Sequence, residues 1–379
     1  MRKFNDPNVV TYYITENVGP LTYIVMELAT KTLADIIKNS KSQEALPLKK
    51  WATDMTKGLL ALHNHKIVHR DLKPSNVLIF DRNVAKLADF GISRELKSCT
   101  RGLQTDARRG TLMWMPPEAL QSADVTFQLL PSFDIFSLAL TIHFTMTRGK
   151  HLFDSTEKGG TDIHVSSNII ENRRNWKSTA HNQWTALKNL LEAMISIDPK
   201  KRPGPAILLE HPFFWNDKKG LDFVYAVHND FKNSKGLDCS GKLNGLHTSF
   251  CQKTGLSSDW GLRLCPNVQS FLNHMDETRE QKSLYDLSRK KYKQTSLVKL
   301  IEFIRDNDQH RAGWSGYKNG LLQRENVFGA KGCNYVQYFF GRFPELTTIL
   351  YTFFQEPKYH GSQLPQYYRF NKNACFPQL

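Results

Sequence analysis

Several features that mark common protein classes are missing from this sequence of 379 residues. It has no C-x-x-C pair, and its six cysteines are scattered, which argues against a zinc site and fits a reducing compartment. It has no run of about 18 apolar residues, because the longest candidate, 136–146, is interrupted by Ser, Thr and His. Its first residues carry no apolar signal-peptide segment. We therefore expect a soluble segment that makes no membrane contact of its own.

Acidic residues are also scarce relative to basic ones. The chain has 51 Lys and Arg against 36 Asp and Glu, which gives a formal net charge of +15. Such a surplus favours polyanionic partners such as nucleic acid or an anionic membrane, although some basic proteins are simply basic. Hydrophobic residues at 40% and charged residues at 23% exclude a disordered chain, and the length leaves room for two domains.

Two motifs of defined chemistry occur in order in the first quarter of the chain. Residues 67–79 read I-V-H-R-D-L-K-P-S-N-V-L-I, and A-D-F-G follows at 88–91. The first predicts a loop between short apolar strands, with Asp71, Lys73 and Asn76 facing one cavity. The second places Asp89 at the end of a strand. The pair matches H-R-D-x-x-x-x-N and D-F-G, and the chain therefore resembles a protein kinase.

This resemblance assigns roles to four side chains. Phosphoryl transfer needs positioning and neutralisation of phosphate charge more than covalent help. By resemblance, Asp71 accepts the proton of the substrate hydroxyl, and Lys73 lies near the transferred phosphate as a point charge. Asn76 and Asp89 would hold Mg²⁺ between the phosphates of ATP.

Residues 8–15 and 21–28 are rich in β-branched and aromatic residues and predict a hairpin. In a kinase they would be the last two strands of the small lobe. The resemblance then makes Glu27 to Ala29 the hinge that binds adenine through its backbone, with Met26 at the back of the pocket. Taken alone, these residues fit an ordinary buried strand pair equally well.

No G-x-G-x-x-G loop, no V-A-I-K lysine and no helix carrying its glutamate partner precede the hairpin. We interpret the chain as a fragment that lacks the nucleotide roof. The alternative is a kinase half without ordinary ATP binding.

A polar, basic segment over 93–110 follows the D-F-G motif. Its Ser98, Thr100 and Thr105 lie near arginines, and such segments become ordered when a phosphate pairs with arginine. Most Ser and Thr residues in a loop are merely solvated, so the sequence does not single out one phosphorylation site.

Three further segments resemble structural parts of a kinase. Glu118 ends a segment like A-P-E, Arg202 is the arginine that usually pairs with it, and Asp134 resembles the buried aspartate that braces the catalytic loop. Apolar spacing predicts helices over 33–38, 49–65 and 184–197, and residues 155–180 are expected to form a polar loop.

The kinase-like part closes with H-P-F-F-W at 211–215, and more than 160 residues follow. Apolar spacing predicts helices over 221–231, from 297 to about 305, and as a pair within 335–354. The Gly-, Ser- and Asn-rich stretch 232–262 is expected to be a loop.

A kinase lobe joined without a linker to this tail resembles the unfolded-protein-response sensor kinase/endoribonucleases (the inositol-requiring enzymes) and the related 2-5A-dependent ribonuclease. The resemblance covers nearly the whole chain. It implies an α+β kinase-like fold, mostly the helical C-lobe with the last N-lobe strands, followed by an all-α nuclease domain. The implied boundaries are 1–215 for the kinase domain, 216–370 for the nuclease domain and 371–379 for a tail.

The tail also carries residue types suited to RNA cleavage without metal. That reaction needs proton transfer, for which histidine is suited, and a cation for the phosphate, which arginine supplies. Tyr292, Arg305 and His310 fall on the family's catalytic tyrosine, arginine and histidine. His310 would be the general acid, Arg305 would stabilise phosphate charge, and Tyr292 would position the phosphate or the attacking hydroxyl. The structural alternative is that His310 only caps a helix.

One position departs from the family pattern. The family has asparagine directly after the arginine, whereas this chain has Asp306, with Asn307 one place later. A carboxylate cannot donate a hydrogen bond to phosphate and repels it. We expect weakened cleavage, unless Asn307 substitutes through a local shift.

The resemblance implies a bifunctional serine/threonine kinase and endoribonuclease at the cytosolic face of the endoplasmic reticulum. It would cleave stem-loop RNA, not DNA, when two copies associate through the kinase half. The alternative is a kinase or pseudokinase scaffold with a non-catalytic helical interaction tail.

Overall fold

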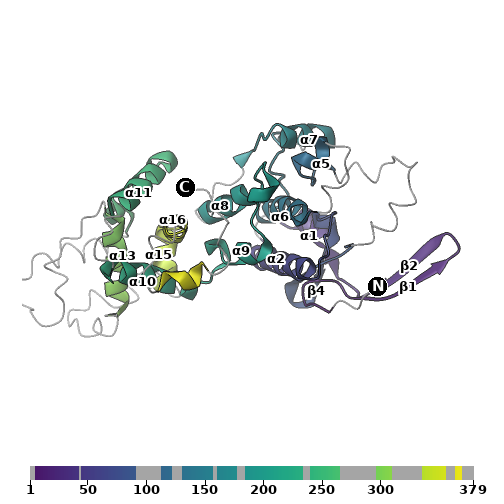
Figure 1. The fold of residues 1–379 in the computed structure, drawn as a ribbon, viewed down its shortest axis with the longest axis horizontal. Helices are drawn as coiled ribbons and strands as arrows, with labels where there is room; N and C mark the ends of the chain where they lie inside the picture. The colour runs from purple at the N-terminus through teal and green to yellow at the C-terminus, as the bar shows by residue number, and fades with distance from the viewer. Residues whose placement is uncertain are drawn as a thin grey trace, which may run out of the picture. The chain divides into compact units, whose positions relative to one another are not determined.

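The computed structural model describes residues 5–41, 44–90, 112–121, 130–156, 160–176, 184–233, 240–264, 296–309, 335–355 and 363–368 (Figure 1). The chain divides into two compact units, which are described separately. Unit 1 contains the described residues up to 176 and those of 190–214. Unit 2 contains those of 184–189 and those from 215 onward. Across these residues, no helix combines the length and the apolar character needed to cross a bilayer.

A two-stranded hairpin begins unit 1, as the sequence predicts. Strands β1 (Tyr12–Val18) and β2 (Leu21–Met26) pair antiparallel, and the turn between them contains Gly19 with a positive φ of 58°. In Figure 1 the hairpin stands off from the helices of its unit. Most of its large side chains are exposed, for example Ile14 at 61% and Tyr23 at 53%, and none is buried. The alternative of an ordinary buried strand pair is therefore wrong.

A second sheet surrounds the catalytic-loop motif. Strands β3 (Lys31–Thr32), β4 (Val77–Phe80) and β5 (Val84–Leu87) form an antiparallel sheet in the order β3-β4-β5. Residues 8–10 add a bridge to β5, because the Val10 amide donates to the carbonyl of Leu87 over 2.9 Å. The H-R-D loop therefore leads into β4, and the D-F-G motif directly follows β5.

Helices form the rest of unit 1. They are α1 (Leu33–Asn39), α2 (Leu48–Asn64), α5 (Pro117–Gln121), α6 (Pro131–Met146), α7 (Asp162–Ile170), α9 (Pro205–Leu209), and α8 (Trp184–Met194), whose first residues belong to unit 2. Short 3₁₀ turns cover Pro74–Asn76, Asp81–Asn83, Pro199–Lys201 and Pro212–Phe214. Helix α6 is apolar on most sides and is almost wholly buried, as expected for a central helix. The predicted apolar stripe of α2 is Trp51, Met55, Leu59, Leu60 and Leu62. All of these are buried except Leu60, which is partly exposed.

The prediction of a polar loop over 155–180 is wrong for its middle part. Helix α7 occupies Asp162–Ile170, and the Thr161 hydroxyl caps it by accepting the His164 amide. Val165 and Ile169 lie one turn apart and are both buried, at 1% and 2% exposed. Two apolar residues are enough to anchor so short a helix, and the polar residues around them hide the pattern.

The regular elements in the described part of unit 2 are all helices, which agrees with the all-α domain expected after an α+β kinase-like fold. Its helices are α10 (Asp217–Asn233), α11 (Ser240–Thr254), α13 (Leu297–Gln309), α15 (Tyr335–Arg342) and α16 (Leu346–Phe353), with 3₁₀ turns at Trp260–Arg263 and Leu364–Tyr367. Trp215 packs edge-on against Phe223 of α10 and Tyr351 of α16, with ring centroids 5.0 and 5.5 Å apart. These aromatic contacts form one side of the core.

The stretch 232–262, expected to be a loop, contains helix α11. The helix buries Leu243, His247, Phe250 and Cys251, a 4-3-1 spacing that places them on one face. Gly241 and Gly245 lie where an added Cβ would meet open space. Because these glycines make the stretch look like a loop, its composition does not reveal the buried face. The prediction was wrong because a histidine and a cysteine occupy two of the core positions.

Helix α13 carries the predicted apolar face. Leu297, Leu300, Ile301 and Ile304 are each at most 1% exposed. The first turn of α13 is capped from α11, because the Asn244 side-chain oxygen accepts the Leu297 amide over 2.8 Å. Trp260 stacks on Phe303 with centroids 5.4 Å apart. The helix that carries Arg305 is therefore fixed along one face by the core.

Candidate catalytic centres

A buried carboxylate holds the catalytic loop in place. Asp134 of α6 is 0% exposed. It accepts the backbone amides of His69 and Arg70, each over 2.8 Å, and lies 2.8 Å from Nε2 of His63. Arg70 has a positive φ of 72°, which an L side chain rarely adopts. The hydrogen bonds from these two amides to Asp134 hold the strained backbone in place, which is the role that the sequence predicts for Asp134.

The structure brings Asp71, Lys73 and Asn76 together. The Asn76 side-chain amide donates to the backbone carbonyl of Asp71 over 2.7 Å and to its Oδ2 over 3.0 Å. Lys73 Nζ lies 2.9 Å from the same Oδ2. The other oxygen, Oδ1, is buried and makes no hydrogen bond among the described residues. Oδ2 is thus engaged by a cation and an amide, whereas Oδ1 is enclosed by the protein.

Asp89 lies beside this group. The backbone amide of the preceding residue, Ala88, donates to the carbonyl of Asn76 over 2.9 Å. Asp89 itself has a positive φ of 61°. The Asp89 amide donates to the hydroxyl of Tyr12, over 2.7 Å, and the Tyr12 ring contacts Phe90 edge-on at 5.3 Å. Burial, together with the Asp89 charge, raises the pKa of Tyr12 to about 12. Sequence reasoning missed Tyr12, because a tyrosine in a strand carries no signal of its own.

The expected adenine hinge joins β2 to β3. Met26 ends β2 and is 42% exposed. The Glu27 carboxylate accepts the Thr11 amide over 2.8 Å and pairs with Lys86 of β5 through both oxygens, at 2.8 and 2.7 Å. The amide of Ala29 has no hydrogen-bond partner in the part of the chain that the structure describes. The ion pair thus fixes the backbone on one side of a free amide.

The expected pair of Arg202 and Glu118 is confirmed. The guanidinium donates to both carboxylate oxygens over 2.6 and 2.8 Å, and it lies over the Phe136 ring at 5.0 Å. The Arg202 side chain is 0% exposed. This fork-to-fork geometry ties the end of the activation segment to the helical core of unit 1.

Of the three predicted nuclease residues, the structure describes only Arg305. It lies in α13, directly after the buried Ile304, and its side chain is partly exposed. Tyr292 and His310 lie outside the described residues, as do Ser98, Thr100, Thr105 and the side chain of Asp306. His310 follows the last residue of α13, Gln309.

Comparisons with known families cover both units. Residues 1–214 match the protein kinase domain, and residues 221–368 match the family described as Ribonuclease 2-5A. The two matches follow each other almost without a gap. The order agrees with the two units and with the motifs in the first.

Relatives with both parts come from distant organisms. A serine/threonine-protein kinase/endoribonuclease IRE1 from Oryza sativa subsp. japonica is 29% identical over 93% of this chain and 38% of its own length. The serine/threonine-protein kinase/endoribonuclease IRE2 of Homo sapiens is 28% identical over 90% of this chain and 34% of its own length. The sensor for unfolded proteins in the ER, ire1, of Schizosaccharomyces pombe is 26% identical over 96% of this chain and 34% of its own length.

The chain therefore spans about a third of the length of the curated relatives that it matches. The kinase match covers more than half of the chain, and the ribonuclease match covers most of the remainder. The chain belongs to the protein kinase family, in the branch of the IRE1 kinase/endoribonucleases.

Proposed function

We propose that this chain is the catalytic part of a bifunctional serine/threonine kinase and endoribonuclease of the unfolded protein response, acting at the cytosolic face of the endoplasmic reticulum. The observation that carries the proposal is the ribonuclease match at 221–368, directly after a kinase match. The names of the relatives, one of them a sensor for unfolded proteins in the ER, support the same process.

In the kinase half, Asp71 takes the proton of the substrate hydroxyl, while Lys73 contacts the transferred phosphate. Asn76 and Asp89 fit a Mg²⁺ ion. The Asn76 amide nitrogen is committed to Asp71, which leaves its oxygen as a ligand, and the Asp89 carboxylate is exposed. Mg²⁺ prefers such oxygen ligands. The bound ion and ATP supply the phosphoryl group and the neutralisation of its charge.

Adenine binds at the hinge. The carbonyl of Glu27 accepts from it and the free amide of Ala29 donates to it, with Met26 closing the back of the pocket. The Glu27–Lys86 ion pair supports this geometry, because it anchors the Glu27 side chain and leaves its backbone carbonyl free to face the ligand.

In the nuclease half, Arg305 binds the scissile phosphate, His310 protonates the leaving 5′ oxygen and Tyr292 positions the phosphate or the attacking hydroxyl. No metal takes part in this step. The buried face of α13 supports the proposal, since a rigid helix fixes where Arg305 lies. The substrate is stem-loop RNA, and two copies associate through the kinase half. The net charge of +15 suits an RNA substrate.

Replacing His310 with alanine is expected to lower the rate of stem-loop RNA cleavage by about 100-fold or more, because a general acid contributes on that order. Autophosphorylation should be unchanged. Gln309→Ala, at the neighbouring position, is the matched control and should leave both activities intact. Cleavage at the normal rate by His310→Ala would contradict the assignment.

Asp306→Asn is expected to raise the cleavage rate by roughly fivefold, since removing one negative charge a few ångströms from phosphate relieves about 1 kcal/mol of repulsion. Initial rates on the same RNA at low salt measure this effect. Asp308→Asn, which removes the same charge two residues along, is the control. Equal rates for wild type and Asp306→Asn would show that this carboxylate does not face the RNA.

A further inference from the structure

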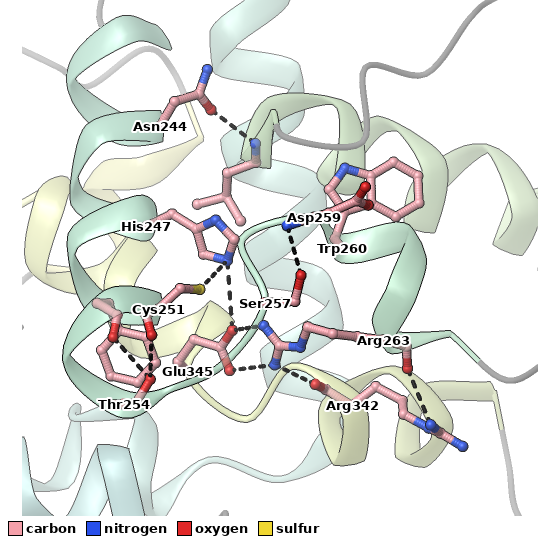
Figure 2. A network of polar contacts seen from close by, with 12 residues as sticks. Asn244, His247, Cys251, Thr254, Ser257, Asp259, Trp260, Arg263, Arg342 and Glu345 are labelled. Carbon is pink, nitrogen blue, oxygen red and sulfur yellow. Dashed lines mark hydrogen bonds and ion pairs between the residues drawn. The ribbon is translucent and has the colours of Figure 1, made fainter.

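Unit 2 contains a buried cluster of three metal-ligating side chains that neither proposed activity uses. His247 and Cys251 lie one turn apart on α11, and Glu345 lies at the start of α16 (Figure 2). They are 0%, 1% and 1% exposed. Cys251 Sγ is 3.5 Å from His247 Nε2, which is 3.7 Å from Glu345 Oε1. All three atoms lie within 4.8 Å of one another.

We propose that His247, Cys251 and Glu345 bind a divalent metal ion of the zinc type inside unit 2. Bonds of about 2.0–2.3 Å in tetrahedral geometry place neighbouring ligand atoms roughly 3.3–3.7 Å apart. Both measured separations, 3.5 and 3.7 Å, agree with this spacing. A thiolate, an imidazole and a carboxylate are also the three ligand types that zinc accepts.

Arg263 prepares the carboxylate for this role. Its guanidinium donates to Oε1 of Glu345 over 2.5 Å and to Oε2 over 3.0 Å, and it lies over the Phe343 ring at 4.5 Å. Its second nitrogen also donates to the carbonyl of Arg342, as Figure 2 shows. Both carboxylate oxygens therefore face the guanidinium, and Oε1 also faces His247. Ligating carboxylates are usually held by such neighbouring donors.

The site would join two parts of the unit. The ion would link α11 to the junction of α15 and α16, which is otherwise held by Arg263. Among the described residues no fourth His, Cys, Asp or Glu joins the group, so water completes the coordination. The site is structural, and it stands independently of the proposed RNA cleavage. It predicts a metal-stabilised fold for a domain whose proposed chemistry needs no metal.

Cobalt titration of the full chain tests the site. After removal of metal with a chelator, Co²⁺ should bind at one equivalent per chain and give a thiolate-to-cobalt charge-transfer band, which Zn²⁺ should bleach. Cys251→Ser should abolish the band, and Glu345→Gln should weaken Co²⁺ binding by at least about tenfold. Cys239→Ser, which removes a cysteine outside the cluster, should keep the band.

Thermal unfolding of the wild type supplies a readout that no variant can confuse. Zn²⁺ should raise the unfolding midpoint relative to the chelator-treated protein, because an ion that binds only the folded state stabilises it. Circular dichroism shows whether each variant is folded. If wild type shows no charge-transfer band and no difference in midpoint, the cluster is an ion-paired network only, and the proposal is overturned. A band that survives in folded Cys251→Ser overturns it as well.

Discussion

Asp134→Ala is expected to lower the free energy of unfolding of unit 1 by about 3–5 kcal/mol, the usual cost of breaking a buried charged network. The carboxylate is 0% exposed and accepts two backbone amides. Its removal leaves the amides of His69 and Arg70 buried without an acceptor. The strained Arg70 backbone then relaxes, which displaces Asp71, the next residue along. Phosphoryl transfer by the chain should be lost together with stability.

Urea denaturation followed by circular dichroism measures the loss, and autophosphorylation measures the effect on the loop. Asp134→Asn keeps the shape and one acceptor oxygen, so it should retain roughly half of the stabilisation that alanine loses. Glu16→Gln, an exposed carboxylate on β1, is the control and should change stability by less than about 0.5 kcal/mol. An Asp134→Ala protein as stable as wild type would show that the two amides find other partners.

Bracing contacts of this kind were predictable because they belong to motifs. The sequence placed Asp134 and the Arg202–Glu118 pair correctly, since each residue type has a fixed partner in the kinase lobe. The contacts of Tyr12 with Asp89 and of Glu27 with Lys86 were not predicted. They depend on how the hairpin lies against β5, and no spacing along the chain encodes that register.

The tail shows the same limit. The apolar face of α13 follows a simple 3-1-3 spacing of aliphatic residues, and it was predicted. Helix α11 was missed because His247 and Cys251 occupy core positions and do not count as apolar. The two side chains form a cluster only with Glu345, far along the chain, whose Oε1 lies 3.7 Å from His247 Nε2. The expectation of no zinc site rests on the absence of C-x-x-C pairs, and a cluster of one Cys, one His and one Glu does not follow that pattern.

Unit 1 is expected to lose stability steeply as the pH falls below about 6.5, the ordinary pKa of histidine. Burial lowers the pKa of His143 and His151 to about 4 and that of His211 to about 3. His69, also wholly buried, shifts in the same direction for the same reason. These histidines are neutral when folded, and they take up protons when the unit unfolds.

The hydrogen bonds explain why these histidines stay neutral in the folded state. Nδ1 of His151 accepts the Phe153 amide over 3.2 Å, while Nε2 donates to the carbonyl of Met113. Nδ1 of His211 accepts the Phe213 amide over 3.2 Å. If either Nδ1 were protonated, its N–H would face the backbone N–H that now donates to it, and that hydrogen bond would be lost. In His143, Nδ1 donates to the carbonyl of Lys150, and a proton on Nε2 would be buried without a partner among the described residues.

The sign follows from these pKa values. Each folded value lies below the unfolded value of about 6.5, so the stabilisation is complete above that pH and is lost as the pH falls toward 4. Each proton taken up on unfolding changes the free energy of unfolding by about 1.4 kcal/mol per pH unit, so the four histidines give a slope of about 5.5 kcal/mol per pH unit. A domain with 5–15 kcal/mol of stability, the range roughly typical of native proteins, should therefore unfold within a few pH units.

The variant His143→Phe tests how many protons the buried histidines of unit 1 take up on unfolding. The Lys150 carbonyl keeps a donor in this variant, because the Thr147 hydroxyl also bonds to it over 3.0 Å. The slope of unfolding free energy against pH, from urea denaturation between about pH 6 and pH 4, should fall by about one quarter. His65→Phe, at an exposed position of unit 1, should leave the slope unchanged. An unchanged slope in His143→Phe would mean that this histidine is already protonated in the folded unit, which its buried, unpartnered Nε2 argues against.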